Sequence, residues 1–316
     1  MLNVLSGFAV VIFVIAIGFG VGRLRLLGPN AVYTLNMFVF WIALPCTLIT
    51  FMSKTDIAQL FGPNLLVVAL STLTTGFLAF LGYRWITRRS TEDSIIAMLA
   101  CTYCNGSNLG IPLAAHLMDD PTLTLPVILF QVGFYGPLSV LALDMRTGGK
   151  QTTNFVRSTL LTILKNPLII GATIGIAISL LQHNTGFTLP TIVADPLGII
   201  ADATVGCALI AFGMSMAEVR VLQPGLSPRR SVWAASLVKT VVHPAIAAFY
   251  GVFLFDATSQ LLLAMVLLAA LPTGQNVFTY AQRFDVNKVL ARDTAVVSTG
   301  LALPVMALIM VLLSFR

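Results

Sequence analysis

The chain has 316 residues, of which 57% are apolar and 9% are charged, whereas soluble domains are about 45 to 50% apolar and about 25% charged. A soluble fold cannot hide that much apolar surface, and the length suffices for about ten membrane-spanning helices of about 20 residues each. The net charge of +6 does not indicate a nucleic-acid partner, because the basic residues stand singly between apolar runs and form no patch interleaved with aromatic residues.

Apolar windows bounded by Gly, Pro and charged residues predict ten spans. The first five lie near residues 4–22, 31–53, 64–86, 94–118 and 123–145. The second five lie near residues 160–182, 192–217, 231–254, 259–282 and 289–314. The sequence therefore predicts an all-α membrane protein with two halves of five spans, residues 1–146 and 159–316, joined by a short cytoplasmic linker at residues 147–158.

The distribution of lysine and arginine predicts the orientation of these spans. Of the 18 basic residues, 15 fall in one alternate set of loops: Arg23, Arg25, Arg84, Arg88, Arg89, Arg146, Lys150, Arg157, Lys165, Arg220, Arg229, Arg230, Arg283, Lys288 and Arg292. The opposite set holds Lys54 and Arg316, and Lys239 lies within a span. Because basic loops face the cytoplasm, we expect a multi-pass protein of the plasma membrane with both termini outside.

The two halves show weak internal similarity at an offset of 167 residues. This offset aligns Ala97-Met98 with Ala264-Met265, Gly133 with Gly300, Pro137 with Pro304, and Asn105-Gly106-Ser107-Asn108 with Pro272-Thr273-Gly274-Gln275. Halves of five spans each lie in opposite orientations, so the similarity predicts an inverted repeat of the kind found in secondary transporters.

Spans four and nine, at the matched positions, carry polar and helix-breaking residues near mid-membrane. Pro112 and Pro272 each lack an N–H donor and crowd the carbonyl four residues earlier, so we expect both helices to be interrupted there. Irregular backbone at that depth must be buried in protein or line a watery cavity, and matched interruptions indicate a transporter's binding site. The alternative is a pair of ordinary proline kinks in which Gly and Ser allow close packing and Asn and Gln join helices.

The free N-termini of such half-helices offer unpaired N–H groups and partial positive charge, which suits a carboxylate. The candidate substrate-binding residues are Asn105, Gly106, Ser107, Asn108, Pro112, Gln131, Pro272, Thr273, Gly274, Gln275 and Asn276. The predicted function is therefore a secondary transporter of a small organic anion, and an anion channel or a membrane receptor built on the same two helices is the alternative.

Three ionisable residues within spans are candidates for ion coupling or for charge near the substrate, because such groups are costly in a membrane. They are Asp202 in span seven and Lys239 and His243 in span eight, of which the last two share a helix face. The structural alternatives are that Lys239 snorkels to the inner surface, that His243 only packs, and that Asp202 faces a vestibule. Na⁺ and H⁺ both stay open as the coupling ion.

Nothing in the sequence predicts an enzyme, a cofactor or a metal site. No G-x-x-x-x-G-K-[ST] loop for ATP occurs, and His116, His183 and His243 fall on different predicted helices without a metal-binding motif. The Cys101-x-x-Cys104 pair lacks further ligands. The expected partners are the lipid bilayer and a small carboxylate.

Several motifs then give the sequence a family resemblance that runs over nearly the whole chain. They are Leu35-Asn36 through Ala43-Leu44-Pro45, Asn105 to Pro112, Ala211 to Met216, Val242-His243-Pro244, Leu271 to Asn276, and Tyr280 to Phe284. At these motifs the sequence resembles the auxin efflux carrier family, which includes plant auxin carriers and bacterial organic-acid permeases.

The resemblance implies ten helices in an inverted repeat, with spans four and nine crossing at the substrate site. It also implies a scaffold of spans one, two, six and seven, an elevator-like moving domain, a carboxylate substrate and a possible homodimer through the scaffold. The chain lacks the long central loop of some plant members, and Asn105-Gly106-Ser107-Asn108 stands where plant members have a Pro-flanked Asn. A small acid such as malate or malonate is therefore expected rather than auxin.

Overall fold

The computed structural model describes residues 2–54, 62–147, 161, 164–218 and 221–313, and the regular elements in this part of the chain are helices. The first half contains α1 (Leu2–Leu24), α2 (Ala31–Phe38), α3 (Leu44–Met52), α4 (Pro63–Ile86), α5 (Thr91–Thr102), α6 (Ile111–Leu117), α7 (Leu125–Phe130) and α8 (Gly136–Thr147). The second contains α10 (Pro167–Thr185), α11 (Thr191–Glu218), α12 (Arg229–Leu237), α13 (His243–Phe253), α14 (Ser259–Ala270), α15 (Asn276–Phe284) and α16 (Lys288–Leu313). Apart from Thr147, the linker predicted at 147–158 lies outside the described residues.

Seven continuous helical segments among the described residues are long and apolar enough to cross a membrane. They are Ala31–Met52, Pro63–Ile86, Pro121–Thr147, Pro167–Thr185, Thr191–Ala217, Arg229–Phe253 and Lys288–Leu313. Their outward faces carry large apolar side chains that are mostly exposed, such as Phe77, Ile199 and Phe253. A face of this kind fits hydrocarbon and would be costly in water. The prediction of an all-helical, multi-pass membrane protein is thus confirmed.

Four prolines, Pro45, Pro112, Pro137 and Pro244, are accommodated by π-turns rather than by breaks. Four such turns occur in the described chain, at residues 39–43, 106–110, 131–135 and 238–242. In each, the residue just before a proline donates its N–H to the carbonyl five residues earlier, as Ile111 does to Gly106. The wider turn makes room for the ring and lets the helix continue. The predicted break at Pro112 is therefore wrong, because the helix passes through that residue.

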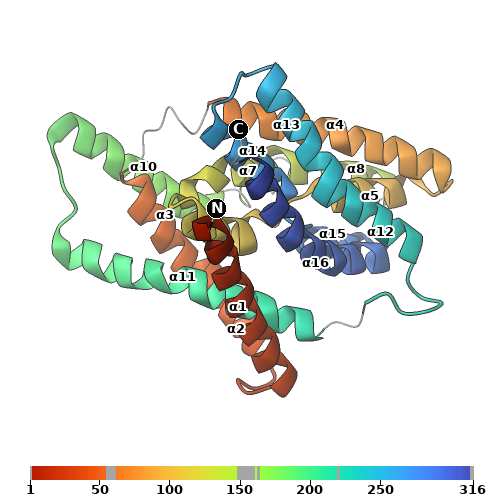
Figure 1. Cartoon of the computed structure of the whole chain (residues 1–316), viewed down its shortest axis with the longest axis horizontal. Helices are drawn as coiled ribbons and strands as arrows, with labels where there is room; N and C mark the ends of the chain where they lie inside the picture. The colour runs from red at the N-terminus through yellow and green to blue at the C-terminus, as the bar shows by residue number, and fades with distance from the viewer. Residues whose placement is uncertain (1, 55–61, 148–160, 162–163, 219–220, 314–316) are drawn as a thin grey trace.

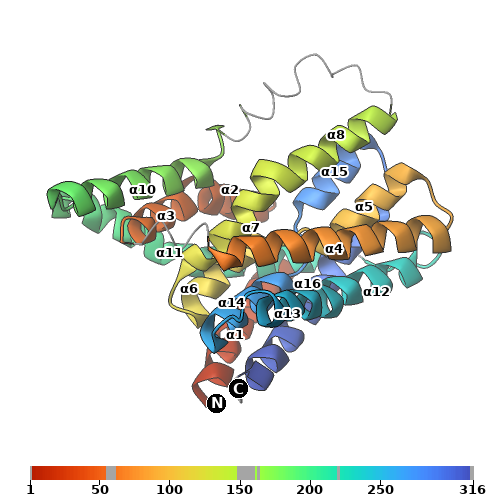
Figure 2. The same cartoon turned by 90° about the horizontal axis from the view of Figure 1, so that it is seen from above.

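The helices form two groups that lie side by side (Figures 1 and 2). In the first group, α1 and α3 pack along α11, and α10 packs along α3. In the second group, α4 packs against α5 and α13, α13 against α14, and α12 against α16. The segments around α6 and α7 lie between the groups in Figure 2. The candidate site described below therefore has walls from both groups.

Glycine residues let the helix backbones of the first group touch. A Cβ atom at Gly213 of α11 would overlap the carbonyl oxygen of Ile15 on α1, and one at Gly22 would lie 2.8 Å from the Cα atom of Met214. A Cβ atom at Gly171 of α10 would lie 2.8 Å from the Cα atom of Pro45. Such close approach between helices is the usual role of small residues in membranes. The first group is therefore packed through its backbones.

We expect Gly213→Ala to lower the apparent melting temperature of the purified protein in detergent. The new methyl group would overlap the α1 backbone, and overpacking of this kind costs about 1 to 3 kcal/mol. Gly20→Ala on α1 is the matched control, because a Cβ atom there meets nothing within 4 Å, and it should leave the melting temperature unchanged or slightly higher. Equal melting temperatures for the two variants would contradict the packing described here.

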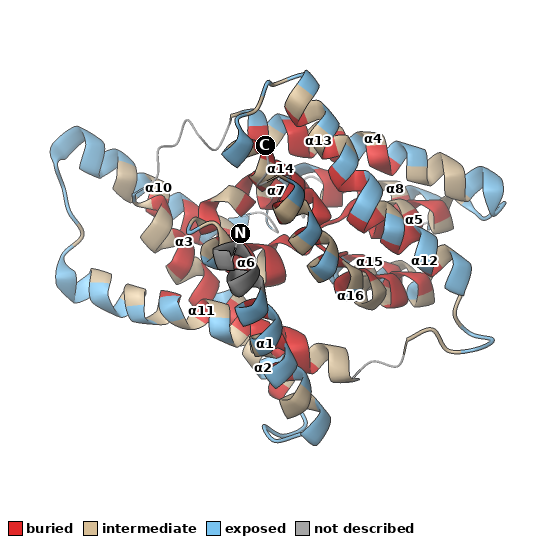
Figure 3. Ribbon diagram, in the orientation of Figure 1, coloured by how far each residue is buried: buried red, intermediate tan, exposed pale blue. Residues whose placement is uncertain are grey.

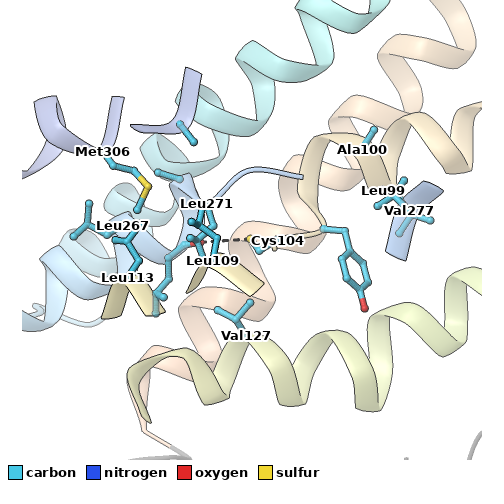
Figure 4. Packing of buried hydrophobic residues seen from close by; sticks show 14 of the residues in the cluster. Leu99, Ala100, Cys104, Leu109, Leu113, Val127, Leu267, Leu271, Val277 and Met306 are labelled. Atoms are coloured by element: carbon cyan, nitrogen blue, oxygen red, sulfur yellow. Dashed lines mark hydrogen bonds between the residues drawn. The ribbon is translucent and has the colours of Figure 1, made fainter. Parts of the chain in front are cut away.

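Buried residues concentrate in the second group and where the two groups meet, as Figure 3 shows. The largest buried cluster includes Cys104 and Leu109 from the segment after α5, Leu271 from the segment after α14, and Val277 of α15. Figure 4 shows Leu109 and Leu271 close together beside Cys104, with Leu267 near them, while Val277 lies next to Leu99. The core thus holds together two segments that lie far apart in the sequence.

Candidate substrate site

Two helical segments of the second group are interrupted, and their interruptions meet. The first interruption lies between the end of α5 at Thr102 and the π-turn that starts at Gly106. The second interruption lies between the end of α14 at Ala270 and the start of α15 at Asn276. Tyr103 has φ −72° and ψ 111°, and Leu271 has φ −51° and ψ 143°. Both segments are therefore extended where they leave their helices.

The extended segments pair with each other as an isolated antiparallel bridge between Cys104 and Thr273. The N–H of Asn105 donates to the carbonyl of Pro272 at 2.8 Å, and the N–H of Gly274 donates to the carbonyl of Tyr103 at 2.8 Å. A side chain at Gly274 would crowd this pairing, because its Cβ atom would lie 3.0 Å from the carbonyl oxygen of Cys104. Each segment thus satisfies backbone groups that the other exposes, as low-dielectric surroundings require.

Protein side chains cover the carbonyl ends of α5 and α14. The Thr273 hydroxyl donates to the carbonyl of Ala100 at 2.6 Å, and the Lys239 ammonium donates to the carbonyl of Ala269 at 2.6 Å. The Cys104 thiol donates to the carbonyl of Leu268 at 3.4 Å (Figure 4). The negative ends of both half-helices are therefore occupied by groups of the chain itself.

The N-terminal ends of the other two half-helices border a cavity of about 150 Å³, which we call the first cavity. Its lining residues are Phe40, Tyr103, Cys104, Asn105, Gly106, Ser107, Asn108, Ile128, Gln131, Val132, Asn166, Leu168, Gly274 and Asn276. Within the described chain, no hydrogen bond engages the side chains of Asn105, Ser107 or Asn108. Asn105 is only 6% exposed as a residue, and its side-chain amide lacks a protein partner among the described residues.

The surroundings of the first cavity favour an anion of modest size. The π-turn and α6 form one helical run from Gly106 to Leu117, and α15 begins at Asn276, so two helix N-termini bring N–H groups and partial positive charge to the cavity. The side-chain amides add neutral donors. The lining contains no acidic residue. The arrangement can bind a carboxylate without a lysine or arginine in the wall.

The Tyr103 ring lines this cavity and contacts residues of α15. It stacks on Tyr135 at a centroid distance of 6.2 Å and meets Tyr280 edge to face at 6.1 Å. Its hydroxyl accepts a hydrogen bond from the Asn276 side chain at 3.2 Å. Tyr103 therefore orients Asn276 toward the same cavity that Asn105 and Asn108 line.

Gln131, on the π-turn between α7 and α8, binds the extended segment as a backbone strand would. Its side-chain oxygen accepts from the N–H of Cys104, and its side-chain nitrogen donates to the carbonyl of Cys104 at 3.2 Å. Both ends of the amide are thereby used within the protein. The side chain lines the first cavity, but these contacts give it a positioning role.

We expect Gln131→Leu to lower both the apparent melting temperature and the rate of transport. Leucine leaves the N–H and the carbonyl of Cys104 unpaired in a buried position, at a cost of about 1 to 3 kcal/mol for each group. Gln182→Leu, at an exposed position on α10, is the control and should melt like the unmodified protein. A Gln131→Leu protein that melts and transports normally would show that the Cys104 backbone finds other partners.

The remaining predicted residues take different positions. Thr273 and Gln275 line a second cavity on another side of the crossing, while Pro112 and Pro272 are absent from the linings of both cavities. Lys239 and His243 lie together, as their spacing predicts, with Nζ of Lys239 at 3.3 Å from Nδ1 of His243. Lys239 is 0% exposed, so it does not snorkel to the surface.

Asp202 and His243 differ in their surroundings, although both were candidates for ion coupling. His243 is buried, and its Nε2 lies 3.4 Å from the Thr72 hydroxyl of α4. Asp202 is exposed on α11 and belongs to the lining of neither cavity. The structure therefore places Lys239 and His243 beside the end of α14 that leads into the crossing. Asp202 does not lie there.

The second cavity, of about 240 Å³, contains a residue that the sequence analysis assigned only to a cytoplasmic loop. Its lining residues are Asn105, Phe212, Ser215, Met216, Thr273, Gln275, Phe278, Thr279, Arg292, Ala295, Val296 and Thr299. Arg292 and Asp293 stand at the start of an otherwise apolar run, which is the signal that could have drawn attention to them. Asn166 was also missed; it caps α10 by accepting from the N–H of Leu168 at 2.9 Å.

The fold and the candidate site define a multi-pass membrane protein of the transporter class. A family model described as "Membrane transport protein" matches residues 4–310, and the chain belongs to this family, the auxin efflux carrier family. The family assignment made from the sequence motifs is thereby confirmed. The family consists of membrane transporters, and no catalytic family is indicated.

Similar proteins come from bacteria and plants. A "Putative malonate transporter" of Rhizobium meliloti is 25% identical over 274 residues, which are 85% of this chain and 82% of that protein. "Auxin efflux carrier component 1" of Arabidopsis thaliana is 30% identical over 154 residues, 48% of this chain and 24% of that protein. "Auxin efflux carrier component 2" of the same plant is 29% identical over 152 residues, 48% of this chain and 23% of that protein. The chain thus matches about a quarter of the length of these plant relatives.

Proposed function

We propose that the protein is a secondary carrier that moves a small organic anion, a mono- or dicarboxylate, across the plasma membrane. The observation that carries the proposal is the meeting of two half-helix N-termini at one small cavity, with the amides of Asn105, Asn108 and Asn276 beside them. Helix N-termini and amide N–H groups are the donors that a carboxylate accepts. The broken helices of transporters place substrates in the same manner.

The size of the first cavity supports a short substrate. Its volume of about 150 Å³ lies well below the roughly 300 to 1,000 Å³ of pockets that hold drug-sized ligands. A three- or four-carbon acid suits this space better than an aromatic acid does. The name of the Rhizobium relative points to malonate, and we take malonate as the first substrate to test.

We further propose that the chain crosses the membrane ten times, as a five-plus-five inverted repeat with both termini outside. The proposed substrate site then lies where spans four and nine cross. The first helix group would be the static scaffold, and the second group would carry the site across the membrane as an elevator. This division is supported by the walls of the first cavity, because Phe40 and Asn166 come from the first group while Asn108 and Asn276 come from the crossing.

Counterflow in proteoliposomes tests the proposed function. Vesicles that contain the purified protein and unlabelled malonate should take up labelled malonate faster than empty-lumen vesicles, and the uptake should saturate. A carrier shows this trans-stimulation because its loaded site returns faster than its empty site. A malonate conductance that neither saturates nor responds to internal malonate would overturn the carrier in favour of an anion channel. Binding of malonate without any flux would indicate a receptor.

The coupling ion is tested in the same vesicles. Uptake is measured with a sodium gradient at equal pH and with a pH gradient in the absence of sodium. Hydroxyls, amides and free carbonyls can bind Na⁺, whereas His243 can carry a proton. Stimulation by one gradient alone identifies the ion, and equal rates with neither gradient identify a uniporter.

A further inference from the structure

The second cavity has a cation in its wall and no acid facing it. Arg292 lies in the lining together with the amides of Asn105 and Gln275 and the hydroxyls of Ser215, Thr273, Thr279 and Thr299. The remaining wall is apolar and includes Phe212 and Phe278. The four hydroxyls donate to backbone carbonyls, so the donors left for a ligand are those of Arg292, Asn105 and Gln275. An apolar pocket with a few convergent polar groups is the usual form of a small-molecule site. These donors and the apolar wall together match an anion with a hydrocarbon part.

Asp293 holds the Arg292 guanidinium in a fixed orientation. The Nε and Nη2 atoms of Arg292 both lie 2.8 Å from Oδ1 of Asp293. The other carboxylate oxygen, Oδ2, accepts the backbone N–H of Leu222 at 3.0 Å. The Asp293 side chain is 0% exposed and that of Arg292 is 32% exposed. The carboxylate is thus the buried anchor, and the arginine extends from it to the cavity.

This orientation leaves donors for a ligand. A guanidinium has five N–H groups, and the contacts with Asp293 use one edge of it. No hydrogen bond within the described residues engages Nη1. Planar carboxylates accept from two N–H groups of an arginine at once. Because Asp293 neutralises much of the arginine charge, the site should bind an anion only moderately, which suits a position that a substrate must leave again.

Asn105 links this site to the first cavity. The residue is 94% buried and lies in the lining of both cavities, and its side chain makes no hydrogen bond with other described residues. The bridge between Cys104 and Thr273 stands at the crossing between the two linings. The same residue thus borders both cavities. The walls of the second cavity also join the two helix groups, with Ser215 on α11 and Arg292 on α16.

We propose that the second cavity is a carboxylate-binding subsite, separate from the first cavity, in which Arg292 and Asn105 bind the carboxylate and Phe212 and Phe278 contact its hydrocarbon part. The subsite rests on the proposed carrier function, since it would bind the same substrate next to the first cavity. It lies next to the basic loop that begins α16, on the side predicted to be cytoplasmic. A malonate molecule held there would contact both helix groups.

Equilibrium binding of labelled malonate to the purified protein in nanodiscs tests the subsite. Asn108 lines the first cavity alone, and Arg292 lines the second alone. Asn108→Ala and Arg292→Gln should therefore each retain about half of the malonate-binding capacity, and the double variant should lose nearly all of it. Arg230→Gln, at an exposed arginine of α12, is the charge-matched control and should keep the full capacity. Size-exclusion profiles verify that each variant is folded.

The outcomes separate the subsite from the carrier function. If Asn108→Ala alone removes all malonate binding, the second cavity binds none and the subsite is wrong, while counterflow by the unmodified protein still supports the carrier. Loss of all binding in Arg292→Gln alone would show one shared site and would also overturn a separate subsite. If neither variant changes the capacity although the unmodified protein binds malonate, both assigned cavities are wrong.

Discussion

Alanine at Asn108 or at Asn276 is expected to lower malonate counterflow by about 10- to 100-fold at malonate concentrations below saturation. Each substitution removes a side-chain donor from the first cavity, and a hydrogen bond to a charged group contributes about 1.5 to 3 kcal/mol. The two residues come from different half-helices, so their loss weakens the site from opposite sides. The measurement is initial counterflow in proteoliposomes that contain equal amounts of protein.

Both variants should remain folded, because the Asn108 side chain has no hydrogen bond with other described residues and Asn276 has a single one to Tyr103. Asn184→Ala, at an exposed position near the end of α10, is the control and should transport normally. Asn108→Asp tests the charge of the substrate. It adds a negative charge to the cavity and should reduce malonate counterflow at least as much as alanine does. Normal transport by both alanine variants would make the crossing a packing device only.

The sequence was sufficient for those features of the site that depend on local chemistry. Pro272 and its neighbours predict the interruption in the second half, and Asn105 to Asn108 predict the polar segment in the first. The place of the first interruption was not predictable in the same way. It falls at Tyr103 to Asn105 because that segment pairs with Pro272 and Gly274, which are distant in the sequence, while Pro112 is absorbed by a π-turn.

The roles of single polar residues depended on tertiary contacts that no pattern contains. Gln131 was a candidate for substrate binding, and only the structure shows that both ends of its amide bind Cys104. Arg292 looked like a topology signal, and it becomes a wall of a cavity because α11 approaches α16 there. Helix periodicity did place Lys239 over His243, since that relation lies within one helix. What the sequence could not say was which helix end the ammonium would reach.

Lys239→Met is expected to lower both the apparent melting temperature and malonate counterflow, the latter at least about tenfold. The Lys239 ammonium caps the carbonyl end of α14 at Ala269, and methionine fills a similar volume without a donor. The buried carbonyl then loses its partner, at a cost of about 1 to 3 kcal/mol, and the favourable contact between a cation and a helix C-terminus is also lost. Because α14 leads directly into the extended segment at Pro272, looser capping should disorder the crossing.

Lys239→Met also has an effect in the opposite direction, because methionine removes a charge from a buried position. The variant is therefore informative. Replacing buried ionic groups by apolar ones of similar volume is often neutral or stabilising, so the sign of the change in melting temperature reports whether the capping or the desolvation is larger. Lys165→Met, at an exposed lysine, is the control. A Lys239→Met protein that melts normally but no longer transports would show that the ammonium acts in the transport cycle itself. A protein that melts lower but transports normally would confine Lys239 to structural support, and His243 would then be the remaining buried candidate for proton coupling.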